Sequence, residues 1–317
     1  MIKPRAMRDA LLENIWHAMD SNEKIFFVSA DFGSPVLDRI RSDHPDRFVN
    51  VGVAEQNLIN VSAGLALEGF QVFAYAIAPF ITMRCFEQIR VSLALLSEVR
   101  QMNVNLIGVG AGYSYVMSGP THQCYEDITL MRSLPNFQIF SPADHKVAGS
   151  LFQRCVDQSG PKYLRLDAQV LPAIYEDDAP SMERGFHVHQ AGDTTCVMAT
   201  GYMLHTALEI AASFRQQGIE LGVIDLFDLA RFNQADLIAV LRKYTHLVSM
   251  EEGFHGRGGM DSLLFELIAR HDLDLRMLNL GIDGKYRFEL GSRVELHEKA
   301  GIGPVAAAKR ISAFLER

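Results

Sequence analysis

Hydrophobic and polar positions follow two alternating rhythms along the first part of the chain. Nearly continuous apolar runs, typical of strands buried on both faces, are 25–30, 71–77, 104–110, 137–143 and 162–167. Apolar residues at helical spacing occupy 5–20, the stretch from about residue 55, 83–96 and 144–157. Strands and helices that alternate in this way predict a mostly parallel sheet with helices on both faces.

The alternation stops near residue 170 and then begins again. The stretch 171–190 is polar, acidic and weakly periodic, so it predicts a linker. Beyond it, strand-like runs are 195–201, 221–226, 246–252 and 275–281, and helical spacing recurs at 203–217, 234–244, 259–270 and 305–316. The expected fold is therefore α/β, with two α/β domains of mostly parallel sheets at 1–170 and 191–317.

Composition narrows the class of protein. The 317 residues are 48% hydrophobic and carry a formal net charge of −8 without a Lys/Arg-rich run, which argues against nucleic acid and anionic membrane as partners. Residues 1–20 lack the apolar core of a signal peptide, and no apolar run is long enough to span a bilayer. The four cysteines are scattered without a CxxC pair, which argues against a zinc site or a disulfide framework. These features predict a soluble, cytoplasmic protein with reduced thiols.

One carboxylate lies where the first domain changes from strand to helix. Glu55 follows the apolar run 48–53 and precedes a long apolar stretch at helical spacing. A charged group at the edge of a core costs several kcal/mol unless it is paired or protonated. Either Glu55 stabilises the helix start through the helix dipole, or its proton serves chemistry.

Four loops follow predicted strands, and parallel α/β sheets bind ligands at the carboxyl ends of their strands. The loops are 29–35, 52–57, 78–84 and 108–123. The last is long and rich in glycine, and loops of that length in compact domains are usually functional. This arrangement predicts that Glu55, Phe80, Arg84 and His122 lie at one edge of one sheet.

Several longer motifs occur in a fixed order. They are "RFVNVGVAEQNLINVSAGLALEG", "FEQIR", "GPTHQCYEDITLMRSLPN", "SPAD" and "MEEGFHGRGG". This set resembles the transketolase family of thiamine-diphosphate enzymes, including the 1-deoxyxylulose-phosphate synthases. The resemblance covers nearly the whole chain but only the C-terminal half of a full-length family member. It implies a pyrimidine-binding domain followed by the transketolase C-terminal domain.

The resemblance implies a catalytic role for Glu55. In the family, the glutamate of the "AEQ" motif contacts N1′ of the pyrimidine of thiamine diphosphate. The cofactor must lose a proton from its thiazolium carbon, and its own 4′-amino group takes that proton as the imino tautomer. A protonated carboxyl at N1′ stabilises this tautomer, and burial favours the protonated form of a carboxyl group.

Other residues receive roles from the same resemblance. His122 in "GPTHQ" matches a catalytic histidine at the carbonyl and hydroxyl of the bound ketose; its alternative is a histidine satisfied by loop backbone groups. Phe80, or Ile81 if the alignment is shifted by one residue, matches the ring that stacks on the aminopyrimidine, with core packing as the alternative. Arg84 matches a family arginine placed with the cofactor, or it is a solvated arginine at a helix start.

Two charged residues at strand ends are also candidates. Arg165 in "YLRLD" matches the phosphate-binding arginine of the family, since a guanidinium suits a planar anion, and a surface ion pair is its alternative. Asp31 in "SADFGSP" matches an acid near the cofactor and the subunit interface, and an Asx turn is its alternative.

The loop 108–118 departs from the family pattern. Full-length transketolases carry a histidine and an acid there that contact the sugar phosphate, whereas this chain has Gly110 and Ser118. We expect Tyr113, Tyr115 and Ser118 to shape a different substrate site, which puts ordinary pentose phosphates in doubt.

The family's metal motif, GDG followed by an Asn, has only a weak counterpart here. "GIDGK" at 281–285 lies in the wrong domain and is interpreted as a turn. The resemblance therefore implies that an N-terminal transketolase subunit supplies the diphosphate site and its Mg²⁺ or Ca²⁺. We expect an α2β2 heterotetramer acting on sugars or sugar phosphates, and an apolar face on 55–69 and 83–97 that the partner covers.

Two other functions remain open. The β subunit of a 2-oxo acid dehydrogenase decarboxylase is also a pyrimidine-binding half, although "GPTHQ" and "MRSLPN" favour transketolase. A non-catalytic regulatory subunit could keep the fold without the chemistry, although Glu55 and His122 argue against it.

Overall fold

The computed structural model describes residues 4–175 and 179–316 and divides the chain into two compact units. The first unit comprises Met1–Ala111, Leu130–Phe140 and Asp144–Ala179, and the second comprises Gly112–Thr129, Ser141–Ala143 and Pro180–Arg317. Most of the long loop 108–123, which follows the predicted strand 104–110, therefore groups with the second unit, although it lies inside the first domain in sequence.

The first unit is built on a fully parallel sheet of six strands in the order β3-β2-β4-β5-β7-β6. The strands are β2 (Ile25–Ser29), β3 (Phe48–Asn50), β4 (Gln71–Ile77), β5 (Asn103–Val109), β6 (Gln138–Phe140) and β7 (Gly160–Leu166). A separate antiparallel pair joins β1 (Arg5–Ala6) to β8 (Val170–Leu171). All five strands expected in this domain are confirmed, and β3 is shorter than the apolar run that predicted it.

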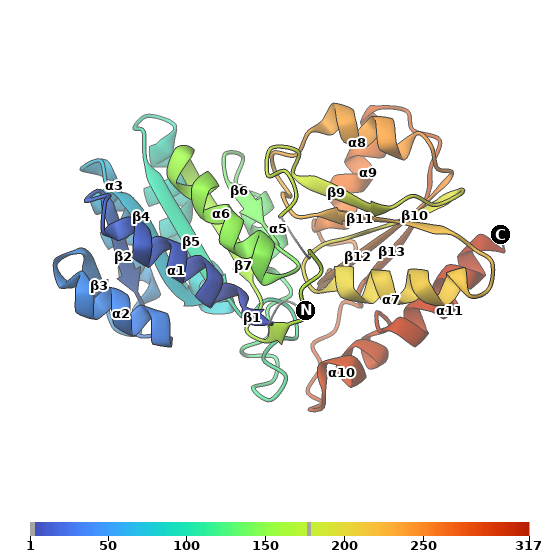
Figure 1. Cartoon of the computed structure of the whole chain (residues 1–317), viewed down its shortest axis with the longest axis horizontal. Helices are drawn as coiled ribbons and strands as arrows, with labels where there is room; N and C mark the ends of the chain where they lie inside the picture. The colour runs from blue at the N-terminus through green and yellow to red at the C-terminus, as the bar shows by residue number, and fades with distance from the viewer. Residues whose placement is uncertain (1–3, 176–178, 317) are drawn as a thin grey trace. The chain divides into compact units, whose positions relative to one another are not determined.

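Helices cover both faces of this sheet. They are α1 (Met7–Met19), α2 (Pro35–Asp43), α3 (Glu55–Leu67) and α6 (His145–Asp157), with short elements η1 (Pro45–Arg47) and α5 (Asp127–Arg132). The helices α1 and α6 lie side by side (Figure 1). Side-chain caps begin two of the helices, Ser34 at α2 and Asp144 at α6. Asp144 of the "SPAD" motif also accepts hydrogen bonds from the backbone of Ile174 and Tyr175 at 2.8 and 3.0 Å, so its role is structural.

The helix expected at 83–96 is not a regular α-helix. Two π-helical segments, η2 (Phe80–Arg84) and η3 (Ile89–Leu95), flank the short α4 (Phe86–Gln88). Thr82 contributes to the irregularity, because its hydroxyl donates to the backbone oxygen of Ala78 at 2.7 Å. Widened turns of this kind occur frequently at functional sites, and apolar spacing alone does not distinguish them from α-helix.

The second unit contains a five-stranded sheet in the order β13-β12-β10-β11-β9, in which only β9 is antiparallel. Its strands are β9 (Phe186–Gln190), β10 (Thr195–Ala199), β11 (Leu221–Leu226), β12 (His246–Phe254) and β13 (Arg276–Ile282). Its helices are α7 (Met203–Arg215), α8 (Gln234–Leu241), α9 (Met260–Arg270), α10 (Arg293–Ala300) and α11 (Pro304–Leu315). Helices α7 and α11 cover one face of this sheet, and α8 and α9 cover the other (Figure 1).

Two elements of the second unit were not expected. The strand β9 lies within 171–190, which we expected to be a linker, and residues 176–178 of that stretch lie outside the described residues. The helix α10 begins with a capping box, in which Ser292 and Glu295 hydrogen-bond to each other's backbone. The fold is α/β with two domains and mostly parallel sheets, as expected.

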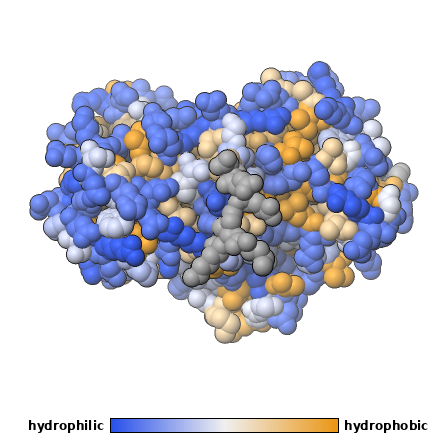
Figure 2. Space-filling view, in the orientation of Figure 1, coloured by the Kyte–Doolittle hydropathy of each residue, from blue (hydrophilic) through white to orange (hydrophobic). Residues whose placement is uncertain are grey.

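Surface and core follow the usual division. The face shown in Figure 2 is mostly hydrophilic, with hydrophobic side chains in separate patches. Among the described residues, no helix is long and apolar enough to cross a membrane. The four cysteines are buried. Burial raises the pKa of the Cys85 and Cys155 thiols to about 12, so both remain protonated at neutral pH.

Candidate active site

The candidate site in the first unit lies where the sheet changes its winding direction. The chain passes from β2 outward to β3 and then back to β4, so right-handed crossovers place α2 and α3 on opposite faces. In doubly wound sheets the crevice between such diverging connections is the usual ligand site. The residues that follow β2, β3 and β4 are therefore the ones to consider.

Glu55 is the first residue of α3 and is almost fully buried, with 4% of its surface exposed. Gly52 provides the turn between β3 and α3 with φ +74°, which favours glycine. Both carboxylate oxygens of Glu55 accept hydrogen bonds from Arg84 Nη1, at 3.0 and 3.1 Å. The predicted carboxylate is thus buried at the helix start and paired with one cation.

Phe80 and Arg84 lie beside this carboxylate. The Arg84 guanidinium lies 3.9 Å from the centre of the Phe80 ring, and 47% of the Arg84 side chain is exposed. The backbone oxygen of Arg84 also accepts a hydrogen bond from Gln56 at 3.3 Å. Phe80 is half-buried, whereas Ile81 is fully buried. Of the two candidates for a stacking residue, only Phe80 presents part of its side chain at the surface.

Asp31 is tied to the same turn through Asn50. The Asn50 amide nitrogen donates to Asp31 Oδ1 at 2.9 Å, and its amide oxygen accepts from the backbone N–H groups of Asp31 and Gly52 at 3.2 and 2.9 Å. Asp31 also has a φ of +53°, which is rare outside glycine. The Asp31–Asn50 pair therefore links the ends of β2 and β3 immediately before Glu55. The sequence analysis did not single out Asn50.

Arg165 lies on β7 and is only 2% exposed, so it does not lie on the surface. Its strand pairs with β5 in register Gly108 with Arg165. A guanidinium buried near the carboxyl end of a central strand fits anion recognition better than a solvated position does. Its predicted phosphate contact stays a prediction.

His122 lies in the segment Gly112–Thr129, which groups with the second unit. It is half-buried, its Nδ1 lies 3.0 Å from Thr121 Oγ1, and its ring lies 6.3 Å from that of Tyr115 in an edge-to-face arrangement. Ser118 is exposed, and its N–H donates to the Tyr115 backbone oxygen at 3.3 Å. His122, Tyr115 and Ser118 are therefore side chains of one loop that are at least partly accessible.

Tyr113 differs from those three residues. Its side chain is fully buried, and its ring lies 4.9 Å from Tyr125 and 5.5 Å from His297. Burial, despite its contact with Tyr125, raises the pKa of Tyr113 to about 12. In this structure Tyr113 is a packing residue of the loop base rather than an accessible substrate contact.

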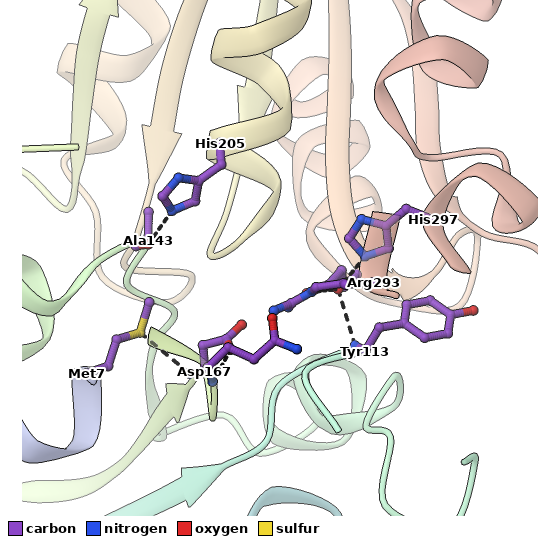
Figure 3. Close-up of polar contacts among 9 residues, drawn as sticks. Met7, Tyr113, Ala143, Asp167, His205, Arg293 and His297 are labelled. Carbon is purple, nitrogen blue, oxygen red and sulfur yellow. Dashed lines mark hydrogen bonds and ion pairs between the residues drawn. The ribbon is translucent and has the colours of Figure 1, made fainter. Parts of the chain in front are cut away.

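A buried charge cluster in the second unit was not found from the sequence. The Glu252 carboxylate binds Arg293 Nε at 3.0 Å and Arg293 Nη2 at 2.6 Å, His297 Nε2 at 2.6 Å, and the N–H of Tyr113 at 3.2 Å. Figure 3 labels these three partners, Tyr113, Arg293 and His297, which lie close together. Burial opposes ionisation, but Arg293 and His297 outweigh it and hold the pKa of Glu252 well below its usual range. The acidic pair at the end of β12, in "MEEG", was the available signal.

The "GIDGK" segment behaves as the expected turn. Its first two residues end β13, and Asp283 forms an ion pair with Arg287 at 2.7 Å. Among the described residues, no group of three or more His, Cys, Asp or Glu is placed to hold a metal ion.

Comparison with known proteins identifies the class. In a doubly wound sheet, ligands usually bind beside the loops that follow the strands around the switch point, and Glu55 lies at the end of one of these loops. The sequence profile described as "Transketolase, pyrimidine binding domain" matches residues 3–173, and that described as "Transketolase, C-terminal domain" matches 185–306. The chain belongs to the transketolase family.

Individual relatives are named as single subunits of larger enzymes. The chain is 32% identical over 261 residues to a subunit of the apulose-4-phosphate transketolase of Actinobacillus succinogenes, covering 82% of each chain. It is 27% identical over 300 residues to "6-deoxy-6-sulfo-D-fructose transketolase subunit SqwH" of a Clostridium species, covering 93% of this chain and 90% of that protein. A solved structure titled "Split gene transketolase, inactive beta4 tetramer" matches with a TM-score of 0.85 and 29% identity, covering 99% of this chain and 100% of that chain.

Proposed function

We propose that this chain is the pyrimidine-binding subunit of a two-chain, thiamine-diphosphate-dependent transketolase that transfers a two-carbon ketol unit between sugars. The observation that carries the proposal is the Glu55 carboxylate, which is 4% exposed at the start of α3 and bonded to Arg84 beside the Phe80 ring. Family membership supports the reaction class, and the site residues support the role of this chain within it.

The residues of this chain fit the aminopyrimidine end of the cofactor. A carboxyl group can donate to or accept from a ring nitrogen, and a half-buried phenylalanine offers a face for stacking. Among the described residues, no group of three or more His, Cys, Asp or Glu side chains is placed to hold the metal ion of a diphosphate. Thiamine diphosphate, when bound, supplies the electron sink needed to break and form a carbon–carbon bond.

Glu55 would hold a proton at the pyrimidine ring nitrogen. In the structure its negative charge is balanced by Arg84, whose side chain is half exposed. We infer that Arg84 moves toward water only when the pyrimidine takes its place at the carboxyl group, because Glu55 is nearly fully buried and needs a partner. Phe80, rather than Ile81, would stack on the ring, and Asp31 would act through Asn50 to fix the turn before Glu55.

The loop and the buried arginine would bind the sugar. His122, Tyr115 and Ser118 are polar side chains of one loop that are at least partly accessible, and we assign them to the ketose hydroxyl and carbonyl groups. Arg165 would bind an anionic end of the substrate. Relatives are named for apulose 4-phosphate and for 6-deoxy-6-sulfo-D-fructose, so anionic sugars of either kind are reasonable candidates.

A second subunit would complete the cofactor site. Two relatives are named as transketolase subunits and a solved structure is titled split gene, which supports a division of the enzyme into two chains. Exposed apolar side chains in the first unit suit such an interface: Val53, Met83, Val91, Leu95 and Val99. The exposed positions of α3 itself are polar or glycine, so this apolar surface is centred on 83–99 rather than on 55–69. We propose an α2β2 assembly in which the partner holds Mg²⁺ or Ca²⁺, in a reducing compartment such as the cytoplasm, which suits the four buried thiols.

Reconstitution tests the proposal. The chain should be mixed with a complementary subunit, thiamine diphosphate and Mg²⁺, and assayed against ketose phosphates, including apulose 4-phosphate, with aldose acceptors. We expect ketol transfer by the mixture and none by either chain alone. Turnover of a 2-oxo acid with a lipoyl acceptor would favour the dehydrogenase alternative. A mixture that binds the cofactor but is inactive with every substrate would favour a regulatory subunit.

A further inference from the structure

The loop between Gly112 and Cys124 is closed at its base and fixed to the second unit. The backbone groups of Gly112 and Cys124 exchange two hydrogen bonds of 3.0 Å, and together they form an antiparallel bridge. Beyond this bridge, the chain carries Tyr115, Ser118 and His122 at least partly accessible to solvent. Anything that moves the bridge would move all three side chains together.

One carboxylate holds the bridge in place. Glu252 accepts the Tyr113 N–H at 3.2 Å, next to the bridge residue Gly112. It also packs against Gly112 so closely that a Cβ added at this position would lie 2.4 Å from Glu252 Cδ. Gly112 has a φ of +53°, so glycine is favoured there for conformation as well as for space.

Two side chains of the helix α10 hold the Glu252 carboxylate in place. Arg293 and His297 are 4% and 1% exposed, and both bond to Glu252. The Arg293 guanidinium lies 3.7 Å from the centre of the Tyr202 ring, and the His297 ring lies between those of Tyr113 and Tyr202 at 5.5 and 5.2 Å. A buried, multiply bonded ion pair of this kind is rigid, and losing one member would leave a buried charge without its counter-ion.

We propose that Glu252 is a positioning residue that fixes the loop 112–124 and thereby the substrate side chains Tyr115, Ser118 and His122. The second unit then contributes to ketol transfer by holding this loop, without touching the sugar through β12 or α10. This proposal rests on the ketol-transfer function proposed above.

The neighbouring residue Glu251 provides a matched control. It is as buried as Glu252, at 1% exposed, and comes from the same strand. Its carboxylate accepts the N–H groups of Met260 and Asp261, both at 3.0 Å, and so caps α9 instead of the loop. Glu251→Gln and Glu252→Gln therefore make the same chemical change in adjacent residues with different partners.

Hydrogen exchange of the full chain tests the anchor without any activity assay. Glu252→Gln should speed amide exchange across 112–124 by about tenfold, equivalent to ~1.4 kcal/mol of local opening, and leave the start of α9 unchanged. Glu251→Gln should show the reverse pattern. Equal exchange of the loop in both variants would overturn the proposal.

Kinetics of the reconstituted enzyme test the consequence for substrate. Glu252→Gln should raise KM for the ketose by about tenfold at unchanged thiamine diphosphate affinity, equivalent to ~1.4 kcal/mol of sugar binding. Gly112→Ala should do the same, because it displaces the loop with all charges intact, and it covers the case in which Glu252→Gln folds poorly. A mobile loop with unchanged sugar kinetics would overturn the positioning role. An inactive wild-type mixture would instead refute the proposed function, while the exchange pattern would still decide whether Glu252 anchors the loop.

Discussion

Two buried carboxylates in this chain each pair with an arginine, and the two arginines differ in burial. Glu55 in the first unit bonds to Arg84, and Glu252 in the second bonds to Arg293. The carboxylates are equally hidden, with side chains 5% and 1% exposed. Their arginines are not, since 47% of Arg84 and 3% of Arg293 is exposed.

The difference predicts different roles for the two arginines. Arg84 regains solvent when it leaves Glu55, so a ligand that replaces it as the partner of the buried carboxylate can displace it. Removing one member of a buried pair costs about 3–5 kcal/mol because it leaves an uncompensated charge. We therefore propose that Glu55 exchanges its partner during function, whereas Glu252 keeps Arg293 and His297.

The largest expected effect is on activity at Glu55. Glu55→Gln should reduce ketol transfer by the reconstituted enzyme by several orders of magnitude, because an amide cannot exchange a proton with the pyrimidine nitrogen. Single-turnover formation of the cofactor–substrate adduct measures this directly. Glu220→Gln, an exposed glutamate of the second unit paired with Arg215, is the control and should be close to wild type. Near-normal rates in Glu55→Gln would remove the catalytic assignment.

The next largest effect is on the free energy of unfolding, where we expect the loss of Glu252 to cost more than the loss of Glu55. Glu252→Ala should lower the free energy of unfolding by about 3–5 kcal/mol, whereas Glu55→Ala should lower it by no more than about 1 kcal/mol. Chemical denaturation at neutral pH compares the two. Similar losses would show that burial of the arginine does not distinguish the pairs.

The dependence of stability on pH should show whether Glu252 is ionised in the folded protein. The pKa of Glu252 is held below its usual range, so the folded protein binds fewer protons at this site than the unfolded chain does. The ionised Glu252 carboxylate contributes to the free energy of unfolding above the unfolded pKa of about 4.3, and this contribution is lost as pH falls toward the lower folded pKa. Wild-type stability should therefore decline more steeply below that pH than the stability of Glu252→Gln. Parallel pH profiles would argue against an ionised Glu252 in the folded state.

Arg165 provides a smaller test that concerns the sugar. Arg165→Ala should raise KM for an anionic ketose by the equivalent of ~2–3 kcal/mol, the worth of a charge-assisted contact, and change cofactor affinity far less. Arg215→Ala on the exposed surface of the second unit is the control. Because Arg165 is 2% exposed, melting temperatures should be measured alongside the kinetics. Unchanged KM, or an equal loss of cofactor binding, would assign Arg165 a structural role.

The smallest expected effect decides between Phe80 and Ile81. Phe80→Leu should weaken thiamine diphosphate binding by ~0.5–1.5 kcal/mol, the usual worth of an aromatic contact beyond its area. Ile81→Val should instead lower stability by ~0.5–1.5 kcal/mol, since Ile81 is fully buried, with little change in cofactor affinity. The opposite result would indicate that the pyrimidine ring lies against Ile81.

Sequence periodicity predicted most of the fold because its strands and helices bury strong apolar patterns. The strand β9 was missed although its residues alternate between apolar and polar, because it is short and follows a polar, acidic stretch. The helix α10 has few apolar residues, but its start was readable, because Ser292 and Glu295 have the spacing of a capping box.

The sequence predicted candidate site residues only where they lie in a recognisable motif. Glu55 was found from its place between strand and helix, and the resemblance supplied its role. The Glu252 cluster joins residues 113, 252, 293 and 297, and such a pairing depends on how distant segments pack rather than on any local pattern. Likewise, nothing in the sequence distinguished buried Tyr113 from half-buried Tyr115 in the same loop.

The central claim is that this chain supplies only the pyrimidine half of a cofactor site. Isothermal calorimetry of thiamine diphosphate in the presence of Mg²⁺, with and without the complementary subunit, tests it directly. We expect weak or undetectable binding to the lone chain and tight, metal-dependent binding to the mixture, because charge-assisted contacts and a metal hold a diphosphate. Tight, metal-dependent binding by the lone chain would contradict the account and would require a diphosphate site within this chain.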